Sequence, residues 1–429
     1  MLRRAYALVL TLAACGSPGS SSGGSTSDSA SGETTAAATV EPGSSGASTR
    51  ATDDPTAAAA TGTSGDAPTS TGDTGEAIDY TQPGLYAVGN TRFELQAGER
   101  TLLVEVWYPA DDSAAADAAQ GRPIAEFVPE GADRVTFEGL LATLSPHGQI
   151  GTRLQTRSAY DGLLAAGGPW PLLVFSHCHG CVRFSAFTIA EHLASHGFIV
   201  AAPDHAGNTL FDQLKGDNAA IDEAFLKVRR ADLGAVLDAL LDPAAAVVPA
   251  ALRGQSDATR VGALGHSFGA ATVGRLAQED PRVRAAMPIA APIENPFFPG
   301  NKLADIHVPL LSVLAEEDNS IGAIGNTVIA TNFDAANPPI RLLRVKDAGH
   351  WNFSDICGLI SDFDAGCGEG TRQSVPGQPF TYLDIDVGRG VARAYAAAFF
   401  DRYLHGNPDA AAYLDAADPA DIVSVATRE

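Results

Sequence analysis

Short, continuous apolar runs alternate with longer helical stretches through most of the chain, and this alternation is the feature that most constrains the fold. Strands are expected at 102–108, 172–176, 198–202, 261–265, 287–291, 310–315 and 340–345, and helices at 184–196, 220–242, 268–279 and 390–404. Continuous apolar runs are typical of strands buried on both faces, and their alternation with helices implies parallel crossovers. The sequence therefore predicts an α/β fold, a doubly wound, mostly parallel sheet with helices on both faces. Ligands of such sheets bind beyond the carboxyl ends of the strands.

The first fifteen residues are expected to be an export signal rather than part of this fold. Arg3 and Arg4 precede an apolar segment at 5–14 that is too short to span a bilayer. The segment ends in Leu12-Ala13-Ala14-Cys15, which resembles the lipobox of bacterial lipoproteins. The resemblance implies cleavage before Cys15 and acylation of that cysteine, with an ordinary secretory signal as the alternative. Both alternatives export the protein, and Gly16 after the cysteine favours the outer membrane if the cell has two membranes.

Residues 16–80 are expected to be a disordered linker, and residues 81–429 the catalytic domain. The linker is rich in Ser, Gly, Thr and Ala and has almost no large apolar side chains, so it cannot offset the entropy of ordering. A coil of about 65 residues has a root-mean-square reach of about 45 Å. Residues 110–168 are predicted to be an irregular insertion within the domain. The formal net charge of −23 argues against nucleic acid as a partner, because phosphate binding needs clustered Lys and Arg.

The most specific motif is Gly265-His266-Ser267-Phe268-Gly269, which lies between a predicted strand and a predicted helix. A G-x-S-x-G sequence in this strand–turn–helix setting is a nucleophile elbow, which places the serine hydroxyl at the edge of the sheet. The following helix N-terminus directs free N–H groups and partial positive charge at the same place. We therefore expect Ser267 to be a catalytic nucleophile; the alternative is a tight structural turn.

A serine hydroxyl needs a base to take its proton, and the base is expected to be His350. After a nucleophile elbow of this type the acid and then the histidine follow in the chain. His307 precedes a strand and therefore lies at the wrong end of the sheet, whereas His405 ends the last helix. His350 comes directly after the predicted strand 340–345.

The acid that orients this histidine is expected to be Asp318, which follows the predicted strand 310–315. Glu316 and Glu317 in the same loop are close competitors, and Glu294 after the preceding strand is a third. The oxyanion of the tetrahedral intermediate needs two N–H donors. One is expected from the backbone of Phe268, and the other from His179, with Cys178 as the alternative.

The chain resembles the α/β-hydrolases that include platelet-activating-factor acetylhydrolases and predicted dienelactone hydrolases. The resemblance rests on VEVWYPA (104–110), PLLVFSH (171–177), EHLASHGFIVAAPDH (191–205) and GHSFGAATV (265–273). It implies the α/β-hydrolase fold and cleavage of carboxylic esters without a cofactor or metal, often of a short acyl chain on a lipid. Two features depart from the acetylhydrolase type: cysteines in the loop after 172–176, and an acid placed one strand later, as in dienelactone-hydrolase-like enzymes.

Cys178, Cys181, Cys357 and Cys367 remain once Cys15 is set aside for the lipid, and four cysteines allow three disulfide pairings. Cys357 with Cys367 would brace the loop of the base, and Cys178 with Cys181 would stiffen the oxyanion loop. A zinc site at His177, Cys178, His179 and Cys181 is the less favoured alternative, because a second pair of ligands is missing. A redox Cys-x-x-Cys is likewise less favoured.

The sequence as a whole predicts a serine ester hydrolase with a lipid anchor in the bacterial cell envelope, acting on a small-molecule or lipid ester. The alternatives are a dienelactone or polyester hydrolase, and a catalytically silent binding module that keeps the fold. Arg229, Arg230 and Asp232 are expected to form a solvated or ion-paired face of the helix at 220–242.

Overall fold

The computed structural model describes residues 78–144, 154–416, 418 and 420–429. The predicted signal with Cys15 and nearly all of the predicted linker lie outside these residues. Tyr80 belongs to the folded part: its side chain is buried, its ring contacts Tyr413, and its hydroxyl donates a hydrogen bond of 2.5 Å to Asp401. Among the described helices, none is both long and apolar enough to cross a bilayer.

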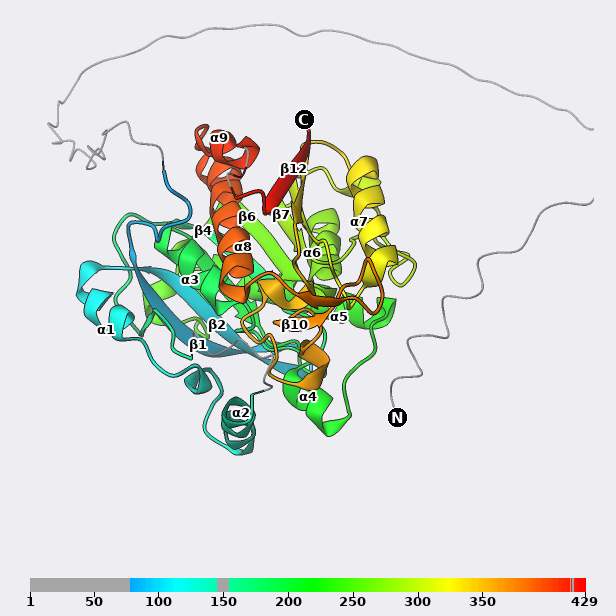
Figure 1. Cartoon of the computed structure of the whole chain (residues 1–429). Coiled ribbons are helices and arrows are strands. Elements are labelled where there is room, and N and C mark those ends of the chain that lie inside the picture. The colour runs from blue at the N-terminus through cyan, green and yellow to red at the C-terminus, as the bar shows by residue number, and fades with distance from the viewer. Residues whose placement is uncertain (1–77, 145–153, 417, 419) are drawn as a thin grey trace, which may run out of the picture. The chain divides into compact units, whose positions relative to one another are not determined.

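A ten-stranded sheet dominates the described residues, in the order β12-β9-β8-β7-β6-β4-β5-β2-β1-β3 (Figure 1). The six strands from β9 to β5 in this order run parallel, and β2, β1 and β12 join through antiparallel pairings. The strands are β1 (Ala87–Ala97), β2 (Arg100–Ala110), β3 (Ala159–Tyr160), β4 (Trp170–Ser176), β5 (Ile199–Pro203), β6 (Ser256–His266), β7 (Val283–Ile289), β8 (Leu310–Ala315), β9 (Ile340–Val345) and β12 (Val423–Arg428). The predicted fold class is confirmed.

Helices cover both faces of this sheet. The helices are α1 (Ala115–Gln120), α2 (Ala132–Ala142), α3 (Phe187–Ser195), α4 (Leu210–Lys215), α5 (Glu223–Leu241), α6 (Phe268–Glu279), α7 (Gly322–Ala335), α8 (Ile385–Phe400) and α9 (Ala410–Asp415). The apolar side chains of α3 and α8 share one core cluster, whereas those of α5 and α6 share another on the opposite face. Because β4 is buried along its whole length, β6 from Val261 onward and β7 at all positions but Arg284, these stretches are mostly apolar rather than alternating.

The predicted irregular insertion at 110–168 contains α1, α2 and the short strand β3, so that expectation was only partly right. A separate hairpin, β10 (Glu369–Thr371) with β11 (Pro379–Thr381), follows the loop of His350. The register of the central strands matters for the site. Ser176 at the end of β4 pairs with Gly265 of β6, and Ala315 at the end of β8 pairs with Val345 of β9. The loops that follow these strands therefore emerge at the same edge of the sheet.

Candidate active site

Ser267 lies in the turn between β6 and α6, in a backbone conformation that is rare for a residue with a side chain. Its φ is 56° and its ψ is −119°, and its N–H donates a hydrogen bond of 2.8 Å to the carbonyl of Ile289. Such strained conformations persist only where the surrounding structure holds them in place, and they are frequent at active sites. The side chain is half-buried, between the fully buried end of β6 and α6.

The two glycines of the motif are required by packing. A Cβ atom on Gly269 would lie 1.9 Å from the carbonyl oxygen of Ser176 at the end of β4. A Cβ atom on Gly265 would lie 2.3 Å from the carbonyl oxygen of Gly269. The sharp turn therefore fits only because both positions lack a side chain, and α6 begins at Phe268 with its N-terminus directed at the site.

His350 and Asp318 form a buried hydrogen-bonded pair in the loops after β9 and β8. Nδ1 of His350 lies 2.7 Å from Oδ2 of Asp318, and both side chains are almost inaccessible to solvent. The other carboxylate oxygen, Oδ1, accepts hydrogen bonds from the N–H groups of Ser320 and Ile321 at 2.8 and 2.9 Å. Since an ionised carboxylate only accepts, Nδ1 of His350 is the donor, and Nε2 is left free to accept a proton.

The loop of His350 is attached to the elbow by His266, the residue before Ser267. Nε2 of His266 donates a hydrogen bond of 2.9 Å to the backbone carbonyl of His350, and the centroids of the two rings are 4.8 Å apart. Burial lowers the pKa of His266 well below its usual value, and the neighbouring His350 lowers it further. The structure thus brings the expected serine and the expected base to the same edge of the sheet, although they are far apart in the sequence.

The other carboxylates considered for the acid have different partners. Glu316 accepts a hydrogen bond of 3.2 Å from the N–H of Asp347. Glu294 accepts from the N–H of Leu303 at 2.9 Å and pairs with Lys302. Among the described residues, Asp318 is the one of the four candidates that contacts the imidazole of His350.

Glu317 has a role that sequence reasoning missed, since it connects the acid loop to the β10–β11 hairpin. Its carboxylate binds Arg372 at 2.8 Å and accepts from the N–H and hydroxyl of Ser374 at 2.9 and 2.6 Å. Burial raises the pKa of Glu317, but the hydrogen bonds from Ser374 and the charge of Arg372 outweigh burial and lower it. Asn319 also donates to the carbonyl of Thr371 at 3.1 Å, so the hairpin is fixed next to Asp318. The only signal in the sequence was that Glu317 is an acidic residue next to the expected acid. Its partners Arg372 and Ser374 lie more than fifty residues away in the chain.

The structure contains the disulfides Cys178–Cys181 and Cys357–Cys367, one of the three pairings that the sequence allowed. The first spans the loop after β4. The second closes a loop that packs on the base, because a Cβ on Gly349 would lie 2.4 Å from Cα of Gly366. Sulfur atoms in a disulfide are not thiolates, so the alternative of a zinc site here loses Cys178 and Cys181 as ligands.

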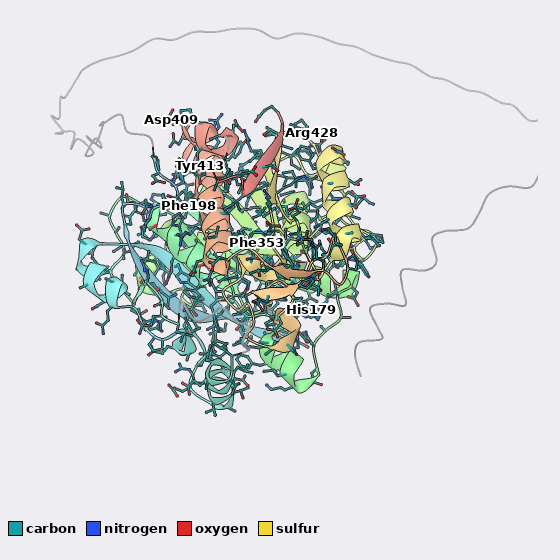
Figure 2. The ribbon with its side chains drawn as sticks, in the orientation of Figure 1. His179, Phe198, Phe353, Asp409, Tyr413 and Arg428 are labelled. Atoms are coloured by element: carbon teal, nitrogen blue, oxygen red, sulfur yellow. A yellow bond between two sulfur atoms is a disulfide. The ribbon has the colours of Figure 1, made fainter. Side chains whose placement is uncertain are left out.

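The loop after β4 carries His179, one of the two expected oxyanion donors, and lies next to the other. The ring of His179 is 6.3 Å from the ring of Phe268, and its Nε2 donates a hydrogen bond of 2.7 Å to the carbonyl of Ala219. His179, labelled in Figure 2, lies close to α4, since a Cβ on the adjacent Gly180 would meet the side chain of Gln213. Both expected donors are therefore on segments that approach each other at the carboxyl ends of β4 and β6.

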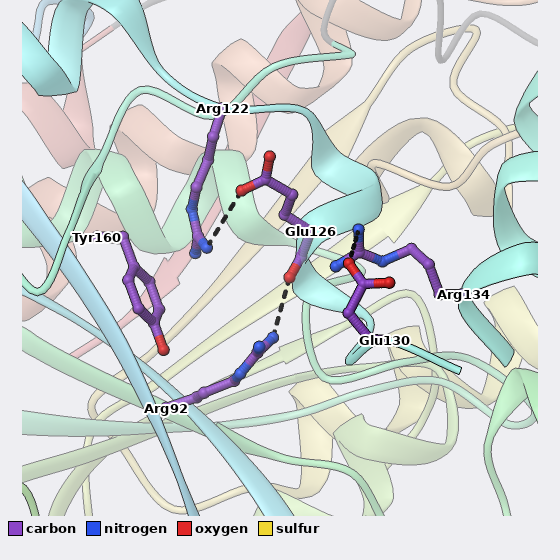
Figure 3. Close-up of a pocket in the computed structure, with 6 residues that line it drawn as sticks. All are labelled: Arg92, Arg122, Glu126, Glu130, Arg134 and Tyr160. Atoms are coloured by element: carbon purple, nitrogen blue, oxygen red, sulfur yellow. Dashed lines mark hydrogen bonds and ion pairs between the residues drawn. The ribbon is translucent and has the colours of Figure 1, made fainter. Parts of the chain in front are cut away.

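A separate pocket of about 310 Å³ lies among β1, α2 and β3 (Figure 3). Its lining residues are Arg92, Arg122, Glu126, Glu130, Arg134 and Tyr160. The guanidinium groups are already paired within the protein: Arg92 binds the carbonyl of Glu126 at 2.9 Å, and Arg134 binds that of Val128 at 2.6 Å. Arg122 lies 4.3 Å from the ring centroid of Tyr160. None of the expected catalytic residues lines this pocket.

Two family models match parts of the sequence, and a solved esterase structure superposes on the fold. Residues 163–355 match the model of the dienelactone hydrolase family, and residues 76–220 match that of platelet-activating factor acetylhydrolase, isoform II. A ferulic acid esterase from Streptomyces cinnamoneus superposes with a TM-score of 0.59 at 26% identity, over 81% of this chain and 98% of the esterase. The chain has the α/β-hydrolase fold. Its central parallel sheet with helices on both faces and this superposition both fit that fold.

Sequence relatives of this chain include an acetylhydrolase and a cutinase. The platelet-activating factor acetylhydrolase of Cavia porcellus is 26% identical over 363 residues, which is 75% of this chain and 77% of the relative. A cutinase of Thermobifida alba is 35% identical over 130 residues, 30% of this chain and 36% of the cutinase. These similarities support a carboxylic ester hydrolase.

Proposed function

We propose that this α/β-hydrolase is a serine-dependent carboxylic ester hydrolase that works through an acyl-enzyme, with Ser267, His350 and Asp318 as its triad. One observation carries the proposal. Asp318 binds the imidazole of His350 at 2.7 Å, and the backbone carbonyl of His350 accepts a hydrogen bond from His266, the residue before Ser267. This contact supports a base, an acid and a serine at one edge of the sheet, which is the arrangement that nucleophilic acyl transfer requires.

The steps follow from the positions of these groups. Oγ of Ser267 attacks the ester carbonyl carbon while Nε2 of His350 takes its proton, and the carbonyl π electrons move to oxygen. The N–H groups of Phe268 and His179 stabilise that oxyanion. The imidazolium then gives its proton to the departing alkoxide, which leaves as the alcohol. Water repeats the sequence on the acyl-enzyme, releasing the acid and restoring the hydroxyl of Ser267.

We propose a short-acyl ester, with an acetylated phospholipid as the first candidate. The acetylhydrolase similarity supports this substrate because it extends over three quarters of the chain. The higher identity to the cutinase over a shorter segment favours a second candidate, a polyester. A catalytically silent binding module is the third possibility.

A substrate series separates these candidates. The protein is assayed with p-nitrophenyl esters of two to sixteen carbons, with an acetylated phospholipid and with a polyester film, each beside the variant Ser267→Ala. The proposal predicts Ser267-dependent cleavage that is greatest for acetyl esters, the phospholipid included. Cleavage of the film with the phospholipid untouched favours the polyester hydrolase. No cleavage of any ester by the native protein favours the binding module.

We also propose that the protein is exported and anchored to the bacterial cell envelope through a lipid on Cys15. The lipobox-like sequence Leu12-Ala13-Ala14-Cys15 supports this, as do the two disulfides, because disulfides persist in oxidising compartments. Metabolic labelling with a radioactive fatty acid is expected to mark the native protein and to be lost in Cys15→Ser. Equal labelling of the variant contradicts the anchor.

A further inference from the structure

His177 follows β4 directly, and its imidazole is fully buried with two hydrogen bonds whose directions can be assigned. Its Nε2 accepts a hydrogen bond of 3.0 Å from the backbone N–H of His205. A backbone N–H can only donate, so Nε2 carries no proton, and in a neutral ring the proton is on Nδ1. Nδ1 therefore donates the second bond, of 2.7 Å, to the carbonyl oxygen of Cys178.

The imidazole stays neutral in the folded protein. Burial lowers the pKa of His177 well below its usual value, and the nearby positive charge of Arg229 lowers it further. A protonated ring would place an N–H against the N–H of His205, so the neutral form is also the one that the geometry accepts.

The bond to Cys178 fixes the orientation of the next peptide group. Cys178 and His179 share a trans peptide, in which the C=O and N–H groups point in opposite directions. With the carbonyl turned toward His177, the N–H of His179 points away from it. The same carbonyl also accepts a longer bond of 3.3 Å from the N–H of Cys181, across the disulfide-closed turn.

We infer that His177 is a positioning residue for the oxyanion hole, holding the Cys178–His179 peptide so that the N–H of His179 faces the oxygen of the carbonyl group that Ser267 attacks. The inference rests on the proposed function, since it concerns the second oxyanion donor of that site. A backbone donor needs such a restraint because a rotated peptide would present the carbonyl of Cys178 to the oxyanion instead of the N–H.

Arg229 of α5 contacts the same loop and connects it to Phe268, the residue that carries the other expected oxyanion donor. Its guanidinium donates to the carbonyl of His177 and, at 3.1 Å, to Oγ of Ser176. Its Nε donates to Oγ1 of Thr272 at 3.2 Å, and its Cζ lies 4.5 Å from the ring centroid of Phe268. One buried cation thus contacts both segments that supply oxyanion donors.

His205, whose N–H donates to His177, is itself hydrogen-bonded in a second arrangement of a serine, a histidine and an aspartate. Its Nε2 lies 2.9 Å from Oγ of Ser176, and its Nδ1 lies 2.9 Å from Oδ2 of Asp232. All three side chains are fully buried, so no substrate reaches Ser176 and the set has a structural role. For the expected solvated or ion-paired helix face, the ion-paired alternative holds for Asp232, with Arg100, and for Arg230, with Glu279. The solvated alternative was wrong for Arg229 and Asp232, which are fully buried.

Two substitutions separate the donor on Nδ1 from the rest of the side chain. In His177→Asn the amide nitrogen occupies the place of Nδ1 and can still donate to Cys178, whereas in His177→Gln the amide lies one carbon further out. His192→Asn is the matched control, because His192 is also buried and binds a backbone carbonyl, that of Tyr80, at 2.9 Å away from the site. Thermal unfolding is measured for every variant.

The inference predicts that kcat for a p-nitrophenyl ester falls about 10- to 100-fold in His177→Gln. This loss in kcat is somewhat smaller than the loss that follows complete removal of an oxyanion donor. KM and the midpoint of the pH–rate profile stay unchanged, and the Ki of a trifluoromethyl ketone, a tetrahedral analogue, rises by the same factor as kcat falls. His177→Asn and His192→Asn keep kcat within about threefold of the native value.

Other outcomes overturn the inference. A His177→Gln protein with native kcat shows that the peptide needs no such restraint. A parallel rise in KM, or a shifted pH midpoint, shows general loosening or a change at His350 instead. If His177→Gln does not fold, His177→Asn decides alone, because a folded protein with kcat reduced more than tenfold contradicts a role for the Nδ1 donor. A native protein that cleaves no ester removes the proposed function itself, and this is seen before any variant is compared.

Discussion

The backbone carbonyl of His350 accepts a hydrogen bond from Nε2 of His266, at 2.9 Å, inside the protein. The loop that carries the proposed base is therefore attached to the residue that precedes the proposed nucleophile. The ring of Trp351 packs on both imidazoles, with centroids 5.7 Å from His266 and 5.3 Å from His350. The distance between base and serine thus depends on a direct contact rather than on the sheet alone.

Replacing His266 with Phe is expected to loosen this attachment. Phenylalanine fills similar space but cannot donate, so the buried carbonyl of His350 loses its partner, at a cost of about 1–3 kcal/mol. We expect the free energy of unfolding to fall by this amount and kcat to fall about tenfold, since proton transfer depends on alignment. Urea denaturation and ester hydrolysis measure the two effects. Native values of both would show that the hydrogen bond does not position the base.

Replacing Asp318 with Asn is expected to lower kcat by a factor on the order of 10³–10⁴, because an amide no longer favours the tautomer of His350 with its proton on Nδ1. Glu316→Gln is the matched control. The native Glu316 lies two residues before Asp318 in the same loop, but its carboxylate accepts a hydrogen bond from the N–H of Asp347. Steady-state hydrolysis of p-nitrophenyl acetate compares the two. If Glu316→Gln is the slower enzyme, the assignment of the acid is wrong.

Replacing Gly269 with Ala is expected to disrupt the elbow, because the added Cβ would lie 1.9 Å from the carbonyl of Ser176. Overpacking typically destabilises by about 1–3 kcal/mol, and the displacement would move Ser267 as well. Gly390→Ala in α8 is the control, since its Cβ would meet nothing within 4 Å and should stabilise the helix by about 0.5–1 kcal/mol. Thermal unfolding and kcat of both variants test this. Equal behaviour of the two proteins contradicts the packing account.

Stability is expected to fall as the pH drops below about 6.5. Burial, with help from nearby positive groups, lowers the pKa of His177, His205 and His266 well below their usual value of 6.5. The unfolded chain takes up protons at these sites as the pH falls while the folded protein does not, so protonation favours unfolding. Each histidine contributes up to about 1.4 kcal/mol per pH unit in this range.

Urea denaturation at pH 7.5, 6.5 and 5.5 measures this dependence. The three histidines together predict a loss of about 3 kcal/mol between pH 6.5 and 5.5, because each is half protonated in the unfolded chain at pH 6.5. In His177→Asn the unfolding free energy should depend less steeply on pH, because about one proton fewer is taken up on unfolding. A stability that is constant over this range, or equal slopes for the two proteins, would mean that these rings are protonated in the folded state.

Much of the central sheet could be predicted from sequence because its strands are buried on both faces. The predicted strands at 310–315 and 340–345 coincide with β8 and β9, and the predicted helix at 268–279 coincides with α6. The strand β12 (Val423–Arg428) was missed because it is a half-exposed edge strand of mixed polarity, whose existence depends on its partner β9. The local sequence around it carries no comparable apolar run.

The candidate site, too, could be predicted from the sequence only in part. The elbow and the loop of His350 could be expected from local sequence, since both directly follow strands whose carboxyl ends meet. The choice of Asp318 among neighbouring acids needed atomic contacts, because three consecutive carboxylates at 316–318 differ in the direction of their side chains. The burial of Arg229 could not be expected, because its acceptors lie on β4 and on the loop after β5, far away in the chain.

Covalent labelling of Ser267 tests the central claim most directly. The native protein is incubated with a fluorophosphonate, which forms a stable bond to an activated serine, and the labelled residue is located by mass spectrometry. The account predicts one label per chain on Ser267, slowed strongly in Asp318→Asn and abolished in Ser267→Ala. A native protein that stays unlabelled, or one labelled at another serine with Ser267→Ala reacting normally, would contradict it.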